Sequence, residues 1–346
     1  MTQTLTLSID LSTVITILGY GFLAFALSML ITPIYTTLAY RYEWWKKART
    51  DSWSGGAAAV YTKLHAAKHL RHIPTMAGLV FVVTIIIATL CGNLTRGETW
   101  LPLTAMAASG AVGLIDDFMN IRGTSKIAGM RSLVKFGLQS VIALAAGWWL
   151  FDRLDVVSIT VPFMDQVFVG GFIIALFWLV VIATSNSVNI TDGLDGLAGG
   201  LLTTSFAAYA VICMVEGKYS LAMLCLTVVG ALLSYTWFNI YPARFFMGDV
   251  GAFALGTMLG VIAVQTDTIF VLPIIGAVYV IETGSVIINR LSKKLRKGKK
   301  VFLSSPLHHH FEALGWPETK VTMRFWILGN VSAVIGLIVF FVGRYQ

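Results

Sequence analysis

Ten long apolar stretches constrain this chain more than any other feature of its sequence. Each is close to the ~20 residues that a helix needs to cross the ~30 Å hydrocarbon core of a bilayer. Of the 346 residues, 57% are hydrophobic and only 12% are charged, whereas soluble domains carry about 25% charged residues. We therefore predict a single all-α, polytopic membrane domain over residues 1–346, with ten transmembrane helices at residues 15–38, 74–93, 101–118, 134–151, 167–185, 197–215, 220–240, 250–266, 269–289 and 323–343.

The positions of the basic residues predict the orientation of the chain. Loops on one side of the ten stretches hold 21 of the 25 Lys and Arg residues, and basic loops stay in the cytoplasm. Both termini are therefore predicted to be periplasmic, and the net charge of +8 reflects topology and gives no indication of nucleic acid as a partner. The predicted cytoplasmic loops are at about residues 41–73, 116–133, 185–196, 241–249 and 290–322.

Three groups of acidic residues lie where an apolar stretch meets a cytoplasmic loop. They are GLIDDFMN at residues 113–120, NITDGLDG at 189–196 and FFMGDVGA at 245–252. Ionisable groups at such a depth are costly and usually functional. Because three separate loops bring acids to the same membrane depth, we predict that they form one site.

Taken singly, the groups have simpler explanations as well. Asp116 and Asp117 end a helix, where acids oppose the macrodipole, so the pair favours a cation site over a solvated helix end. Asp192 and Asp195 share a face if their segment is helical, but Asp and Gly clusters also make ordinary turns. Asp249 opens a helix and is alone best explained as an N-cap.

Three consecutive histidines, His308, His309 and His310, lie inside the last cytoplasmic loop, in SSPLHHHFEALGWPETK. Consecutive residues cannot easily all turn toward one ion, so we favour phosphate contacts over a metal site. The nearby KKLRKGKK segment at residues 293–300 is most simply an anchor to anionic lipid headgroups. Acids, histidines and bases together indicate magnesium with a phosphorylated substrate, because magnesium binds one or two carboxylates and the substrate's phosphate oxygens.

The motifs NSVNITDGLDGLAGG, ARFFMGDVGAFALG, LIDDF and SPLHHHFEALGWPETKVTMRFWI resemble those of phospho-N-acetylmuramoyl-pentapeptide-transferases. The resemblance runs from about residue 73 to residue 330. Its triple-histidine segment is specific to this family, whereas the paired acids resemble the wider superfamily of polyprenyl-phosphate sugar-phosphate transferases. It implies a multi-pass protein of the bacterial inner (plasma) membrane with a cytoplasmic active site, and a short periplasmic β-hairpin at residues 155–166.

The reaction implied by this resemblance is a magnesium-dependent transfer of phospho-MurNAc-pentapeptide. UDP-MurNAc-pentapeptide is the donor and undecaprenyl phosphate the acceptor, and the products are lipid I and UMP. This is the first membrane step of peptidoglycan synthesis. The sequence leaves both a monomer and a homodimer open.

The resemblance also implies roles for individual residues. Asp249 is the implied magnesium ligand, and Asp116 and Asp117 are the implied catalytic acids at the entrance for the lipid phosphate. His308 and Lys135 join the catalytic group, Lys135 as a contact of the phosphates. Substrate binding is implied for Thr75, Asn189, Asp192, Asp195, Asn239, Phe246, Asn289, His309 and His310.

Two mechanisms remain open at this stage. The second pKa of a phosphate monoester is near 6, so the lipid phosphate is largely ionised and can attack the sugar-linked phosphorus directly. A two-step route through a covalent aspartyl intermediate is also chemically allowed. We favour the single displacement.

The chain departs from the family pattern at four positions, and two other functions compete. Asn120 and Leu70 stand where the family usually has lysines, Ala77 replaces a glycine, and Asn289 replaces a glutamine. A related UDP-N-acetylhexosamine:polyprenyl-phosphate transferase shares the acids, but is not expected to carry PLHHHFE. A transporter places its acids at mid-bilayer, whereas only Glu282 lies deep in a predicted span here.

Overall fold

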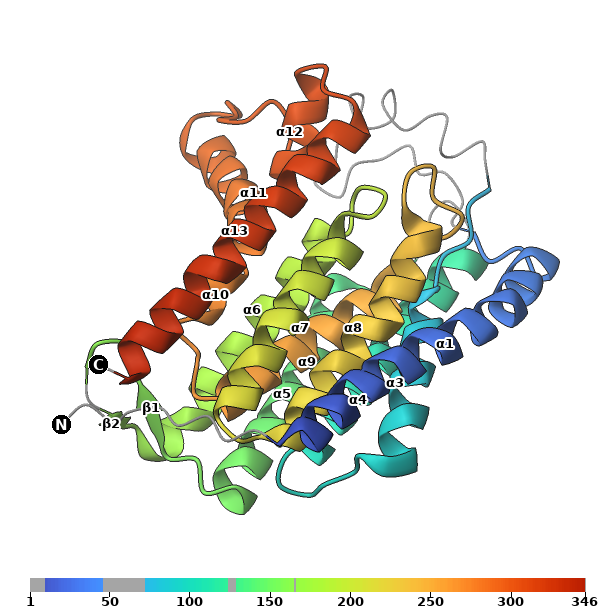
Figure 1. The fold of residues 1–346 in the computed structure, drawn as a ribbon. Helices are drawn as coiled ribbons and strands as arrows, with labels where there is room; N and C mark the ends of the chain where they lie inside the picture. Colours follow the sequence, from blue (N-terminus) through green and yellow to red (C-terminus); the bar gives the residue numbers. More distant parts are fainter. Residues whose placement is uncertain (1–9, 46–71, 124–128, 165, 346) are drawn as a thin grey trace.

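The chain folds into a bundle of helices with one small hairpin (Figure 1). The computed structural model describes residues 10–45, 72–123, 129–164 and 166–345. Inside lipid, a helix satisfies its backbone groups within its own segment, so long apolar stretches adopt this form. The longer helices are α1 (Leu11–Arg41), α3 (Gly78–Gly92), α4 (Trp100–Arg122), α5 (Ser132–Arg153), α6 (Ile173–Thr191), α7 (Leu197–Val215), α8 (Tyr219–Asn239), α9 (Gly248–Gln265), α11 (Ala277–Leu295) and α13 (Glu318–Tyr345).

Each of the ten predicted stretches contains a helix, and the ninth is divided at Gly276 into the short α10 (Leu272–Ile275) and α11. Within the described residues, seven helices are long and apolar enough to cross a membrane, namely α1, α5, α6 with its preceding turn, α7, α8, α9 and α13. This finding confirms the all-α polytopic membrane class. The count of ten crossings and the outward termini stay predictions.

The predicted hairpin is present, but its second strand lies further along the chain than expected. Strands β1 (Ser158–Thr160) and β2 (Gln166–Phe168) are antiparallel and pair Ile159 with Val167. The predicted start of the fifth span at residue 167 was therefore wrong. Val167 and Phe168 are apolar, so hydropathy predicts them as the beginning of a membrane helix. They instead belong to a strand, and α6 follows only after the turn η1 (Gly170–Phe172).

Helices also extend further into the loops that were predicted to be cytoplasmic than the sequence indicated. α4 continues to Arg122 and α6 to Thr191, and the predicted loop 290–322 contains the short helix α12 (Leu307–Ala313). Hydropathy falls where polar side chains begin, but the i to i−4 backbone bonds that define a helix do not depend on side-chain polarity. Most of the predicted loop 41–73, and residues 124–128 of the next, lie outside the described residues.

Helix α9 lies at the centre of the bundle, where every residue from Val250 to Val264 is buried. Glycines let its backbone approach three neighbouring helices. A Cβ atom on Gly113 of α4 would lie 2.3 Å from the carbonyl oxygen of Asp249, and one on Gly78 of α3 would lie 2.4 Å from the backbone of Gly251. A Cβ atom on Gly256 of α9 would lie 2.7 Å from the backbone of Ser185 on α6. Small residues at helix contacts are the usual means of tight packing in membranes.

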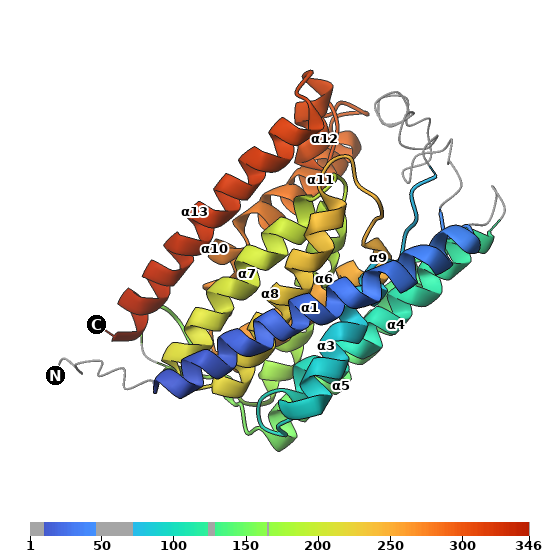
Figure 2. The same ribbon diagram turned by 45° about the vertical axis from the view of Figure 1, so that its right-hand side comes forward.

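The two ends of the bundle differ in what they carry. α12 and the turns α6–α7 and α8–α9 share one end, whereas the hairpin, the start of α1 and the end of α13 lie at the other (Figures 1 and 2). At the hairpin end, Asp267 accepts a hydrogen bond of 2.7 Å from the backbone N–H of Thr160, and Arg344 pairs with Asp267 at 3.2 Å and with Glu216 at 3.0 Å. These bonds tie the hairpin to α13 and to the end of α7.

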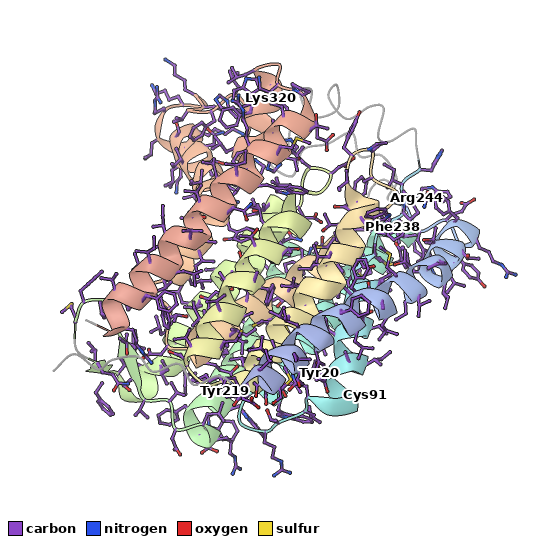
Figure 3. All side chains as sticks on the ribbon, viewed as in Figure 1. Tyr20, Cys91, Tyr219, Phe238, Arg244 and Lys320 are labelled. Atoms are coloured by element: carbon purple, nitrogen blue, oxygen red, sulfur yellow. The ribbon has the colours of Figure 1, made fainter. Side chains whose placement is uncertain are left out.

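The chain contains three cysteines, Cys91, Cys213 and Cys225, and the sequence predicts all three to be buried small hydrophobes, without metal or disulfide spacing. Cys213 and Cys225 are buried, but Cys91 is exposed, so that prediction was wrong for Cys91. Figure 3 places it at the hairpin end of the bundle, near Tyr20. Cys91 is the next-to-last residue of α3.

We predict that Gly113→Ala destabilises the bundle by about 1–3 kcal/mol, the usual cost of forcing extra volume into a packed core. The new methyl group would overlap the first turn of α9 at Asp249. The matched control is Gly137→Ala in α5, where an added Cβ meets no atom within 4 Å. Thermal unfolding of the purified variants in detergent measures both, and equal melting temperatures for the two variants would contradict the close contact of α4 and α9.

Candidate active site

Four helices bring polar side chains together at the end of the bundle that carries α12. Lys135, near the start of α5, donates to Oδ2 of Asp116 on α4 at 2.8 Å and to Oδ2 of Asp249 on α9 at 2.7 Å. Asn189, near the end of α6, donates to Oδ1 of Asp249 at 3.2 Å. The first and third acidic groups therefore meet in space, with Lys135 between Asp116 and Asp249, and from the second group Asn189 reaches Asp249.

Asp116 is held from several directions. Its Oδ1 accepts from the backbone N–H of Met130 at 2.6 Å, and its Oδ2 accepts from the side chain of Asn120 at 2.9 Å in addition to Lys135. The structure therefore gives Asn120, which replaces a family lysine, a neutral donor role. Because α4 continues to Arg122, Asp116 and Asp117 lie before the last turn of the helix and do not end it as predicted.

Asp117 is fully buried and faces the first turn of α9. Its Oδ2 accepts from the backbone N–H of Val250 at 3.1 Å, so it satisfies one of the free N–H groups at that helix start. Gly248 adopts a positive φ of 74°, and a Cβ atom there would lie 2.4 Å from Asp117 Oδ2 and 2.9 Å from Thr75 Oγ1. Only glycine fits this position without strain.

Two segments that are far apart in the sequence pair beside this turn. Phe246 N–H donates to the carbonyl of Pro74 at 2.8 Å, and Ala77 N–H donates to the carbonyl of Phe246 at 3.0 Å. Thr75 and Phe246, both predicted to bind substrate, are thereby held next to Gly248 and Asp117. The ring of Phe246 is half-buried, whereas Thr75 is 3% exposed.

The segment between α6 and α7 is a turn, so Asp192 and Asp195 do not share a helix face. Gly196 has a positive φ of 77°, which ends helical geometry there. Asp192 is half-buried, whereas Asp195 is 2% exposed and accepts from the backbone N–H of Ala243 at 3.0 Å. Asn239, at the end of α8, accepts from Gly196 N–H at 2.9 Å and donates to the carbonyl of Phe245, so it also joins the two turns.

The three histidines of α12 point to three different partners. His308 is fully buried, and both its Nδ1 and its backbone N–H contact Glu282 of α11, at 3.0 and 3.1 Å. His309 pairs with Glu312 at 2.7 Å, and His310 accepts from the backbone N–H of Leu303 at 3.2 Å. The expectation that the three rings cannot share one ion agrees with this geometry.

His308 also connects α12 with the turn after α6. A Cβ atom on Gly193 would lie 2.3 Å from its Nε2, so the ring packs directly on the glycine. Its partner Glu282 is completely buried, and the sequence marked this residue only as a deep acid without a role. Their separation of 26 residues explains why sequence spacing gave no signal for the pair.

Asn289, the remaining residue predicted to bind substrate, is 3% exposed. Its side chain bonds to backbone groups. Its Oδ1 accepts from the N–H groups of Val301 and Phe302 at 3.0 and 2.9 Å, and its Nδ2 donates to the carbonyl of Phe302. The described contacts therefore join it to the loop after α11 and not to the group around Asp249.

The donor set around Lys135 fits a hard cation. Asp116 and Asp249 each present one carboxylate oxygen to the same ammonium group, within 2.8 Å. Magnesium typically binds one or two carboxylates and takes its other ligands from water and substrate phosphates. Among the described residues no group of three or more His, Cys, Asp or Glu side chains forms a complete metal cage, so the chemistry of these two carboxylates matches a metal shared with a substrate.

Comparison with known proteins identifies the family of this chain. Residues 99–267, which contain Asp116, Lys135, Asn189 and Asp249, match the family model Glycosyl transferase family 4. Over 330 residues the chain is 38% identical to the phospho-N-acetylmuramoyl-pentapeptide-transferase of Chloroflexus aurantiacus and 37% identical to that of Chloroflexus aggregans. Each alignment covers 91% of this chain and 86% of the relative. The chain therefore belongs to the phospho-N-acetylmuramoyl-pentapeptide-transferase family and is a transferase.

Proposed function

We propose that this protein transfers phospho-MurNAc-pentapeptide from UDP-MurNAc-pentapeptide to undecaprenyl phosphate, giving lipid I and UMP, with magnesium as the cofactor. The observation that carries the proposal is the meeting of Asp116, Lys135 and Asp249 at one end of a membrane bundle. Membership of the family supports the reaction class. The triple-histidine segment supports the peptide-bearing substrate over a simpler nucleotide sugar, because the resemblance links it to this family alone.

In this proposal the chain's own residues bind and orient two phosphates. Asp249, with Asp116 beside it, would hold the magnesium ion, which would supply Lewis-acid chemistry and charge neutralisation for the diphosphate. Asp117 accepts from the first turn of α9 and thereby fixes the position of Asp116 on α4 relative to Asp249 on α9. Asp116 takes the last proton of the lipid phosphate or positions that group, and Lys135 contacts the transferred phosphate. Positioning and charge neutralisation are the main needs of phosphoryl transfer.

The UDP part is assigned to the turn between α6 and α7. Asn189 and Asp192 lie at its start, and Gly193 lets the ring of His308 pack directly against the turn. The half-buried ring of Phe246 offers a face on which a pyrimidine can stack. Thr75, His309 and His310 complete the proposed pocket, and Asp195, Asn239 and Asn289 support it through the backbone contacts described above.

We place this site at the cytoplasmic face of a bacterial inner membrane. The basic residues Arg244, Arg296 and Lys320 belong to the same end as the site, as predicted for cytoplasmic loops, and Figure 3 places Arg244 and Lys320 there. The lipid acceptor then reaches the carboxylates from within the bilayer, while the nucleotide arrives from the cytoplasm.

We predict that purified protein with magnesium and undecaprenyl phosphate releases UMP from UDP-MurNAc-pentapeptide and not from UDP-GlcNAc. Asp249→Asn keeps the size of the side chain and removes its charge, and we expect a loss of about 100-fold or more, as for other groups that stabilise transition-state charge. The control is Asp152→Asn, at the opposite end of the bundle in an exposed pair with Arg153, which should leave turnover unchanged.

Equal use of both nucleotides would assign the chain to the UDP-N-acetylhexosamine branch. Substrate uptake by sealed vesicles without UMP release would favour a transporter. Unchanged turnover in Asp249→Asn would overturn the assignment of the carboxylates.

We predict that Cys91 reacts with a membrane-impermeant maleimide from the periplasmic side. It is the one exposed cysteine among the three in the chain. The control is Lys320→Cys in a Cys91→Ala background, because exposed Lys320 lies at the opposite end. This variant should react in inverted vesicles and not in spheroplasts. The reverse pattern would show that the predicted orientation of the chain in the membrane is wrong.

A further inference from the structure

Lys135 occupies an electrostatically unusual place. It lies in the first turn of α5, where a positive charge opposes the helix macrodipole. It contacts Asp116, which lies before the last turn of α4 and is 3% exposed. Its ion pairs with Asp116 and Asp249 offset the dipole penalty and place an ammonium group between two carboxylates.

Each carboxylate uses one oxygen to accept from this ammonium group and the other to accept from a different donor. Oδ2 of Asp116 and Oδ2 of Asp249 accept from Lys135, while the Oδ1 atoms are bound by Met130 N–H and by Asn189. A magnesium ion needs carboxylate oxygens at about 2.0–2.1 Å. It cannot use these two Oδ2 atoms while the ammonium lies between them, because the two cations would repel each other at contact distance.

Lys135 has room to leave this position. Its side chain is 22% exposed, compared with 3% for Asp116, and its ammonium lies 5.4 Å from the ring centre of Phe253. A lysine carries its charge on a flexible four-carbon stem, so a change of rotamer moves the ammonium without moving α5. Asp116, by contrast, is held by backbone and side-chain donors and stays in place.

We propose that Lys135 is an internal cation that occupies the metal position between Asp116 and Asp249 until a divalent ion binds, and that it then moves to the phosphate oxygens of the substrate. This inference rests on the proposed function and adds a step to it. The two carboxylates keep a positive partner before and after the exchange, so they do not repel each other while the site is without substrate. Lys135 arrives at the phosphates only once the metal is bound.

The test is the affinity of nucleotide-free protein for Mn²⁺, measured from the electron paramagnetic resonance signal of the free ion. We expect Lys135→Met to bind Mn²⁺ about tenfold more tightly than the natural protein, since the competing charge is gone. Its UMP release should nevertheless fall, because the phosphate contact is lost. A merely structural lysine would lower both quantities, so opposite shifts identify the proposed exchange.

The matched control is Arg131→Met. Arg131 directly precedes α5, carries the same charge and makes no ion pair within the described ranges, so its removal tests general electrostatics alone. We expect its Mn²⁺ affinity to stay within about twofold of the natural protein, since exposed charges are screened by water and salt. Lys135→Arg, which keeps the charge, should not bind Mn²⁺ more tightly either.

Equal or weaker Mn²⁺ binding in Lys135→Met would overturn the inference. Asp249→Asn separates this outcome from a failure of the proposed function. If Asp249→Asn loses Mn²⁺ while Lys135→Met shows no gain, only the role of Lys135 is wrong. If Asp249→Asn binds Mn²⁺ like the natural protein, the metal assignment itself is wrong. Should Lys135→Met not fold, Lys135→Gln gives the same comparison with a polar side chain.

Discussion

The close packing of α9 against α3, α4 and α6 is the constraint on which the site depends. Apolar side chains gain little by moving from lipid to a helix contact, so close backbone approach and hydrogen bonds must hold the helices together. Gly113, Gly78 and Gly256 provide that approach on three sides of α9. Because the first turn of α9 is enclosed in this way, the backbone of Asp249 has one position relative to Asp116 and Asn189.

The charges of the site follow from where these helices begin and end. Asp249 is the second residue of α9, and Asp117 accepts from Val250 N–H, so both acids lie at a helix start that favours negative charge by about 0.3–1 kcal/mol each. Lys135 has the opposite arrangement, because a positive charge in the first turn of α5 opposes the macrodipole of that helix. Its ion pairs with Asp116 and Asp249 compensate for this cost.

The sequence predicted the membrane class, the approximate helix positions and the approach of the Asp116 and Asp249 segments, because hydropathy and the placement of charge are local properties. It did not predict the contacts that fix the site. Glu282 bonds to His308 across 26 residues, and Asp117 to Val250 across 133. Such pairs depend on helix order in three dimensions. The segment around Gly196 is a turn inside the predicted loop 185–196, but the sequence could not decide between a turn and a helix there, since Asp and Gly clusters fit both.

The hydrogen bonds of the predicted substrate residues divide them into two groups. Asn239, Asn289 and Asp195 bond to backbone N–H or C=O groups of other turns, and a ligand could replace these bonds only by opening the turns. Asp249, by contrast, accepts from the side chains of Lys135 and Asn189, and a rotamer change can exchange these bonds. An unsatisfied buried backbone group costs about 1–3 kcal/mol. Substrate binding should therefore leave the bonds to backbone groups intact and exchange the side-chain bonds of Asp249. We infer that Asp249, Lys135 and Asn189 face the reacting phosphates, while Asp195, Asn239 and Asn289 keep the surrounding turns in place.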